Sequence, residues 1–141
     1  MKGFQVTERI ERPIDQVWRR LTDWERAGDW MRGVDRLRVV GGGQPSEGAE
    51  MLFVTRGKER STRVVAWQPP KQVALASTQG GITATYRYRC TGDGDATEVT
   101  LDAVCEARGV VWKLLSPLIS RAMKRADGGQ IAALKQVVES D

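Results

Sequence analysis

Two tyrosines, Tyr86 and Tyr88, offer the clearest chemistry toward a small molecule in this chain. They stand two positions apart in the stretch 82–91, whose alternation of apolar and polar residues predicts a β-strand with both phenols on its apolar face. A phenol that lines a cavity donates a hydrogen bond to a ligand oxygen, whereas a phenol in a core has its hydroxyl satisfied locally. The sequence leaves both alternatives open.

Other catalytic or metal-binding chemistry is scarce. The chain has no histidine, so the commonest general base and the commonest metal ligand are both missing. Its two cysteines, Cys90 and Cys105, lack the CxxC spacing of many zinc sites. We therefore predict no catalytic residue, no metal site and no cofactor.

A wider set of residues is predicted to line a ligand cavity. Arg63 is either an exposed arginine on a strand or, facing inward, a cation that would meet an acidic ligand. Trp30 and Trp112 are candidates for the cavity mouth, with packing in the core or anchoring of a helix as the alternative. The expected ligand-binding residues are Trp30, Arg63, Trp67, Leu75, Tyr86, Tyr88, Leu101, Trp112, Ala122, Met123, Ala126 and Gly129.

A long amphipathic helix over 117–139 is expected to hold one side of this cavity. Ser116 followed by Pro117 is typical of an N-cap and a first helical residue, and apolar or small residues then recur at helical spacing. Gly128-Gly129 indicates either close packing on a sheet with a mild kink, or a cavity wall. The small residues of this helix form a row: Ala122, Ala126, Gly129 and Ala133.

The rest of the chain predicts an antiparallel sheet. A strand over 4–11 precedes a helix that opens at Pro13 and a short second helix over 24–31. Short turns rich in glycine and proline imply hairpins between the later strands. Six further strands are expected, over 35–41, 49–56, 59–68, 72–79, 82–91 and 97–107. The fold class is therefore α+β, in a single domain over 1–141.

The final hairpin carries a register prediction. A turn centred on Gly92–Asp95 pairs Tyr86 with Leu101 and gives the hairpin one apolar and one polar face. The same register separates Cys90 from Cys105 by about 27 Å along adjacent strands. Both thiols are therefore expected to be free, with Cys90, near the turn, the more reactive.

The preceding strands leave one orientation open. A turn at Gly80-Gly81 places Leu75 beside Tyr86, so the apolar face continues onto the strand over 72–79. Across Pro69-Pro70 the register is ambiguous, and either of two sets of side chains faces inward. One set is Thr62, Val64 and Ala66, and the other, which we favour, is Arg63, Val65 and Trp67.

Composition narrows the range of partners. The net charge of +4 arises from 22 Lys and Arg scattered among 18 Asp and Glu, without a basic tract, so no nucleic-acid partner is expected. No apolar run approaches the ~18 residues of a membrane span, which predicts no stable membrane insertion. The opening Met1-Lys2-Gly3 runs into a strand pattern rather than a signal peptide, so we expect a cytoplasmic protein. The oligomeric state stays open.

Both ends of the chain resemble the START-like (SRPBCC) superfamily in its polyketide cyclase/dehydrase branch. The motif positions that match the family's opening are Pro13, Val17, Trp18, Leu21, Asp23, Trp30 and Gly33-Val34. Leu134-Lys135 and Glu139 are similar to its closing helix. The resemblance covers nearly the whole chain and implies a helix-grip fold. In that fold a curved antiparallel sheet of about seven strands wraps a long C-terminal helix, with a hydrophobic cavity between them.

The resemblance does not imply one activity, because family members bind lipids, hormones and polyketides and some are enzymes. The leading hypothesis is binding or transport of a small hydrophobic molecule, with affinity from buried apolar area at about 25 cal/mol per Å². An alternative is a polyketide cyclase or aromatase in which Tyr86, Tyr88 or an inward Arg63 polarises a carbonyl or moves a proton. A third is an interaction module with a filled core.

Overall fold

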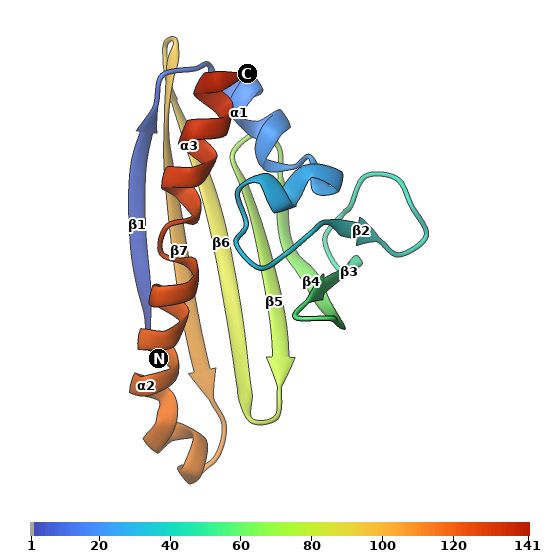
Figure 1. Cartoon of the computed structure of the whole chain (residues 1–141), viewed down its shortest axis with the longest axis vertical. Helices are drawn as coiled ribbons and strands as arrows, with labels where there is room; N and C mark the ends of the chain where they lie inside the picture. Colours follow the sequence, from blue (N-terminus) through green and yellow to red (C-terminus); the bar gives the residue numbers. More distant parts are fainter. Residues whose placement is uncertain (1) are drawn as a thin grey trace.

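A seven-stranded antiparallel sheet packs against helices on one face (Figure 1). The structure is a computed structural model that describes residues 2–141. The strands are β1 (Lys2–Ile10), β2 (Leu37–Val39), β3 (Glu50–Thr55), β4 (Lys58–Gln68), β5 (Gln72–Gln79), β6 (Ile82–Asp93) and β7 (Ala96–Ala107). The helices are α1 (Ile14–Leu21), the 3-10 helix η1 (Trp24–Asp29), α2 (Val110–Asp127) and α3 (Gln130–Ser140). The strands lie in the order β1-β7-β6-β5-β4-β3-β2.

This arrangement confirms the helix-grip fold that the sequence predicted. The order is a strand, two short helices, six strands and a C-terminal helical segment that crosses the sheet lengthwise (Figure 1). The core lies between the sheet and α3, α1 and η1. Its fully buried side chains include Tyr88, Leu101, Ile131, Leu134 and Val138.

The C-terminal helix begins earlier than Ser116-Pro117 suggested. It starts at Val110, after Gly109, whose φ of 88° favours glycine. Pro117 lies inside α2 and cannot donate to the carbonyl oxygen of Lys113, one turn earlier. The Ser116 hydroxyl donates to that same oxygen at 2.9 Å. The Ser-Pro pair therefore lies inside the helix, where the serine hydroxyl makes the hydrogen bond that proline cannot. The prediction that it begins the helix was wrong.

Gly128-Gly129 divides the helical segment into α2 and α3. A Cβ at Gly128 would lie 2.5 Å from the carbonyl oxygen of Lys124, closer than real contacts allow. A Cβ at Gly129 would meet nothing within 4 Å. Gly128 is thus the position that requires glycine. The break leaves Asp127 and Gln130 at adjoining helix ends.

The predicted register is right for one of the last two hairpins and shifted by two residues for the other. The predicted pairing of Leu75 with Tyr86 across the β5–β6 turn is confirmed. Tyr86 pairs with Ala103 on β7, two positions away from the predicted partner, because the strands continue to a tighter turn at Gly94-Asp95. A shift by two residues preserves which face each side chain occupies. The predicted apolar face therefore survives the error.

A bulge in β4 settles the orientation that the sequence left open. The register shifts at Val65, so side chains before and after it follow opposite alternation. Val64 is fully buried and Arg63 is exposed, whereas Trp67 faces inward and packs on Trp18, with ring centroids 5.4 Å apart. The favoured inward orientation is right for Trp67 and wrong for Arg63 and Val65.

Helix side chains bond to the backbone of the edge strand β1 and its continuation. The Ser120 hydroxyl donates to the Gly3 carbonyl at 3.4 Å, and the Lys135 ammonium donates to the Arg9 carbonyl at 2.6 Å. The backbone N–H of Glu11 donates to the Glu139 carboxylate at 2.8 Å. These contacts tie α2 and α3 to the rim of the sheet.

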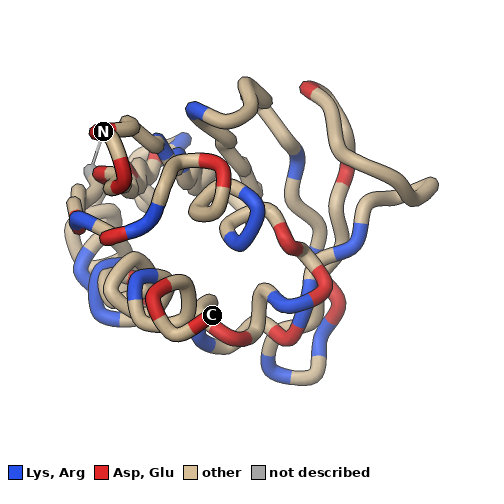
Figure 2. Tube along the Cα trace, turned by 90° about the horizontal axis from the view of Figure 1, so that it is seen from above, with Lys and Arg blue, Asp and Glu red and all other residues tan. Residues whose placement is uncertain are grey.

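Positions of Lys and Arg and of Asp and Glu are distributed all around the Cα trace, as a view along the length of the molecule shows (Figure 2). Both cysteines are free, as predicted, and both are buried. Among residues 2–141, no helix is long and apolar enough to cross a membrane.

Candidate functional site

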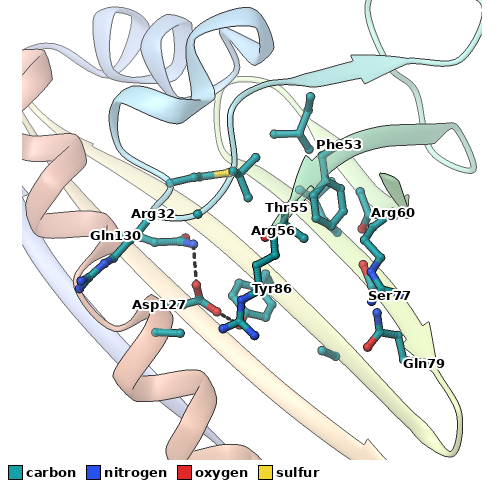
Figure 3. Close-up of a pocket in the computed structure, with 18 of the residues that line it drawn as sticks. Arg32, Phe53, Thr55, Arg56, Arg60, Ser77, Gln79, Tyr86, Asp127 and Gln130 are labelled. Carbon is teal, nitrogen blue, oxygen red and sulfur yellow. Dashed lines mark hydrogen bonds between the residues drawn. The ribbon is translucent and has the colours of Figure 1, made fainter. Parts of the chain in front are cut away.

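An open pocket with a volume of about 1010 Å³ lies between the sheet and the break in the C-terminal helix. Strands β5 and β6 form its floor, and the adjoining ends of α2 and α3 form one wall. The loop after η1 and strands β2–β4 form the opposite wall (Figure 3). Its apolar and aromatic lining consists of Met31, Val34, Leu37, Phe53, Leu75, Ala84, Tyr86, Tyr88, Ala122 and Ala126.

The structure gathers part of the expected ligand-binding set at this pocket. Both tyrosines lie on its floor because they share one face of β6. Two alanines of the expected small-residue row lie on its wall because they share one face of α2. The expected residues that line the pocket are Leu75, Tyr86, Tyr88, Ala122 and Ala126.

The remaining expected residues lie elsewhere. Trp30 is buried and meets the Tyr88 ring edge-to-face with centroids 5.7 Å apart, so it is a core residue rather than a lid. Trp112 packs against the Gly80-Gly81 turn, where an added Cβ on Gly81 would lie 2.1 Å from its ring. The others outside the lining are Arg63, which is exposed, Trp67 and Leu101, which face the core, and Met123 and Gly129 on the helices.

A chain of four hydrogen-bonded side chains connects the pocket floor to the helix break. The Tyr88 hydroxyl donates to Gln130 Oε1 at 2.6 Å, and Gln130 Nε2 donates to Asp127 Oδ1 at 3.3 Å. The Tyr86 hydroxyl donates to Asp127 Oδ2 (Figure 3). Both phenols are therefore satisfied within the protein, and their donor hydrogens point at the helix ends.

Burial governs the proton affinities of this network. Burial raises the pKa of Tyr86, and its hydrogen bond to Asp127 raises that pKa further. Burial also raises the pKa of the Tyr88 hydroxyl, with the Asp127 charge adding to the shift. The pKa of Asp127 is raised by burial as well, against the opposing effect of its bonds from Tyr86 and Gln130. The phenols thus remain neutral donors at neutral pH, and Asp127 is a carboxylate with enhanced affinity for a proton.

Cationic side chains surround the pocket. They are Arg32, Arg56, Lys58, Arg60 and Arg125. None of them forms an ion pair with another residue of the described chain 2–141, and Asp127 is the single acid in the lining. Because unpaired cations attract anions, the pocket favours ligands that carry negative charge.

Arg56 is placed by an unusual backbone conformation. It occupies the β3–β4 turn with Gly57, and both residues have positive φ, 52° and 75°. Such two-residue turns match the twist of paired strands, which offsets the cost of positive φ in an arginine. The side chain extends from the turn into the pocket (Figure 3).

Sequence reasoning missed three residues of this site. Asp127 was not among the expected ligand-binding residues, although it is the first acid after the cationic stretch 107–126. Gln130 is a polar residue on the buried face of α3. Arg56 precedes a glycine in a turn, which signals a hairpin but not the direction of its side chain. In residues 2–141, no group of three or more His, Cys, Asp or Glu could hold a metal ion.

Comparison with known protein families identifies the family of the chain. A model of the family described as polyketide cyclase / dehydrase and lipid transport matches residues 1–139. The chain belongs to this family. The resemblance found at both ends of the sequence is thereby confirmed. Family membership suggests binding of a hydrophobic ligand or a polyketide cyclase-type function, without choosing between them.

Solved structures share the fold of this family member at low sequence identity. A START superfamily protein from Mycobacterium smegmatis has a TM-score of 0.73 and 17% identity, with 99% of each chain covered. The Zhui aromatase/cyclase from Streptomyces sp. R1128 has a TM-score of 0.71 and 15% identity, with 96% of this chain and 92% of the other covered. A protein from Thermus thermophilus has a TM-score of 0.71 and 19% identity, with 96% of each chain covered. The search of curated proteins found no match.

Proposed function

We propose that this protein binds a small hydrophobic molecule in the pocket between β5, β6 and the helix break. The observation that carries the proposal is the pocket itself, with a volume of about 1010 Å³. That volume is in the range of ligand sites, which are clefts lined mainly by apolar and aromatic side chains. An interaction module with a filled core would not be expected to contain such a pocket.

The lining also suggests the chemistry of the ligand. Leu75, Phe53 and Ala84 offer contact to an apolar body, and the unpaired Arg56 and Arg60 offer charge-assisted hydrogen bonds to an acidic group. The two phenols donate their hydrogen bonds to Asp127 and Gln130, so the arginines, rather than the tyrosines expected from the sequence, would orient the ligand. The proposed ligand is therefore an apolar molecule with a carboxylate or another anionic group.

Native mass spectrometry of the purified protein tests this proposal. We expect a co-purified small molecule, which denaturation releases, and saturable binding of an apolar fluorescent dye that the released molecule displaces. A protein that carries no adduct and shows no saturable dye binding would contradict the proposal.

A second candidate function is a cyclase-type reaction, which the contact between Tyr86 and Asp127 favours. A carboxylate with a raised pKa at a pocket wall is suited to take a proton from a carbon acid. Protonation of Asp127 weakens its hydrogen bond from the Tyr86 hydroxyl, which can then donate to the oxyanion left on the substrate. Incubation with a poly-β-ketone analogue separates the two functions. A cyclised product that Asp127→Asn abolishes supports catalysis, whereas unchanged recovery of the bound compound supports binding alone.

A further inference from the structure

The first turns of α2 expose a set of large apolar side chains to solvent. They are Val110, Val111, Leu114, Leu115 and Leu118, which we call the α2 apolar face. Their exposed fractions run from 40% for Leu115 to 75% for Leu114. At 3.6 residues per turn they share an arc of about 140° on one side of the helix. Exposed apolar patches of this kind mark interaction surfaces, whereas single exposed residues elsewhere need no explanation.

The α2 apolar face belongs to a strongly cationic segment. Between Glu106 and Asp127 the chain has five cations and no acid. These cations are Arg108, Lys113, Arg121, Lys124 and Arg125, and none forms an ion pair with any residue in the described range 2–141. The surface that covers this face must therefore accept both apolar contact and positive charge.

The face lies at one end of the molecule, where no other element of the described residues 2–141 covers it. The first turns of α2 form the lower end in Figure 1, beside the β5–β6 turn. Trp112, on the opposite side of the helix, packs against Gly80-Gly81, where an added Cβ would meet its ring at 3.0 and 2.1 Å. The indole therefore anchors the helix start to the sheet and keeps the α2 apolar face turned outward.

Apolar and cationic residues follow one another along the helix axis. The apolar stretch from Val110 to Leu118 is about 12 Å long, and Arg121 to Arg125 occupy the next ~10 Å. Interfacial amphipathic helices lie in the membrane plane with their apolar face about 5–10 Å into the boundary between lipid headgroups and acyl chains, and with basic residues at the anionic headgroups. The exposed apolar arc of α2, followed on the same helix by Arg121, Lys124 and Arg125, offers both kinds of contact.

We propose that the α2 apolar face docks this protein reversibly on the surface of an anionic lipid membrane. A second copy of the chain is a poorer occupant, because pairing two such faces would bring two sets of unpaired cations together. The docking surface is distinct from the ligand pocket and stands whether or not the pocket binds a ligand. Docking would nonetheless bring the pocket wall at Ala122 and Ala126, which follow on the same helix, close to the membrane.

Vesicle flotation with the full chain tests the docking. We expect the protein to float with vesicles of phosphatidylcholine mixed with phosphatidylglycerol and to stay behind with phosphatidylcholine alone. High salt should release it, because screening weakens attraction to the anionic surface. Arg121→Gln and Lys124→Gln should each lower the partition coefficient about fivefold.

Two substitutions of exposed apolar residues show whether flotation depends on the α2 apolar face or on any exposed apolar residue. Leu114→Glu should abolish flotation, whereas Val65→Glu, an equivalent change at the exposed bulge position of β4, should leave it unchanged. Both residues are exposed, so both variants should keep the wild-type thermal unfolding midpoint. Absent flotation with the mixed vesicles, or equal flotation with phosphatidylcholine alone, overturns the proposal. So does a dimer in analytical ultracentrifugation that Leu114→Glu dissociates.

Discussion

The hydroxyl of Tyr86 donates a hydrogen bond to the carboxylate of Asp127, 41 positions later in the chain. This bond joins the middle of β6 to the last residue of α2, where the helix breaks. With Gln130 and Tyr88 it fixes both helix ends over the pocket floor. The break is therefore part of the wall of the site rather than a weakness in the helix.

The raised pKa of Asp127 predicts a pH-dependent stability. Burial raises this pKa above its ordinary value of 3.8, so the contribution of the group to stability is complete below that value. The contribution is then lost as the pH rises through the folded-state pKa. In urea unfolding, Asp127→Asn should gain free energy of unfolding relative to wild type as the pH is raised from acid to neutral. Asp15→Asn, an exposed change in the first turn of α1, is the control. A pH-independent difference between Asp127→Asn and wild type would contradict this reasoning.

The two glycines at the break should differ in their tolerance of alanine. Gly128→Ala puts a Cβ 2.5 Å from the Lys124 carbonyl oxygen, so we expect a loss of about 1–3 kcal/mol in the free energy of unfolding. Gly129→Ala enters open space, and we expect a change within about 0.5 kcal/mol. Thermal and denaturant unfolding of the two variants measure the difference. Equal stabilities would mean that the break does not depend on close approach at Gly128.

The sequence predicted the sheet and its faces well because strand alternation has a period of two. Leu75, Tyr86 and Tyr88 lie on the predicted face, and the error of two residues in the final hairpin left that face unchanged. The bulge at Val65 reversed the alternation without a sequence signal, which is why Arg63 was misplaced. The alternation within a strand was therefore predictable from the sequence, and the extra residue of the β4 bulge was not.

The site was predicted less well than the fold, because its polar residues are defined by contacts distant in the chain. Asp127 carries a charge, which is typical of a solvent-exposed helix residue. It is partly buried because it contacts Tyr86, which is distant in the chain. Arg56 enters the pocket through the geometry of a turn, which hydrophobic periodicity does not describe. Ser116-Pro117 led to a wrong prediction of the helix start for a different reason. The Ser116 hydroxyl donates to the Lys113 carbonyl oxygen and so replaces the backbone hydrogen bond that Pro117 cannot make.

Filling the pocket from the helix side should prevent ligand uptake. Ala126→Phe places a large ring at the pocket wall, and we expect the affinity for an apolar dye to fall by about tenfold or more. Ala132→Phe makes the same change at an exposed position of α3 outside the lining and should bind the dye as wild type does. Fluorescence titration measures both affinities. Unchanged dye binding by Ala126→Phe would place the ligand elsewhere.

Removing a pocket cation should discriminate between charged and neutral ligands. Arg56→Gln should weaken binding of a long-chain fatty acid about two- to fivefold, the effect of a partly exposed ion pair, and leave its methyl ester unaffected. Arg63→Gln is the matched control, because Arg63 is exposed outside the pocket lining. Calorimetric titration of both compounds is the measurement. Equal losses for the acid and the ester would show that Arg56 acts through packing rather than charge.

The two thiols should be slow to react in the folded protein. Burial raises the pKa of Cys90 to about 12, and burial raises the pKa of Cys105 as well. Since the thiolate is the reactive form, a thiol reagent should modify Cys90 about a thousandfold more slowly than an exposed cysteine. This replaces the expectation that a position near the turn makes Cys90 reactive. Titration should count two thiols after denaturation without reductant, and rapid labelling of the native protein would contradict the burial.

The bonds from Ser120, Lys135 and Glu139 to the backbone near β1 bear on how the protein avoids aggregation. An edge strand with free N–H and C=O groups is a template on which another chain can form a new strand. Here the helices occupy acceptors at Gly3 and Arg9, and a donor at Glu11, that an incoming strand would use. At the other edge, β2 is only three residues long and offers little to pair with. The sheet is open in topology, yet neither rim readily nucleates fibrils.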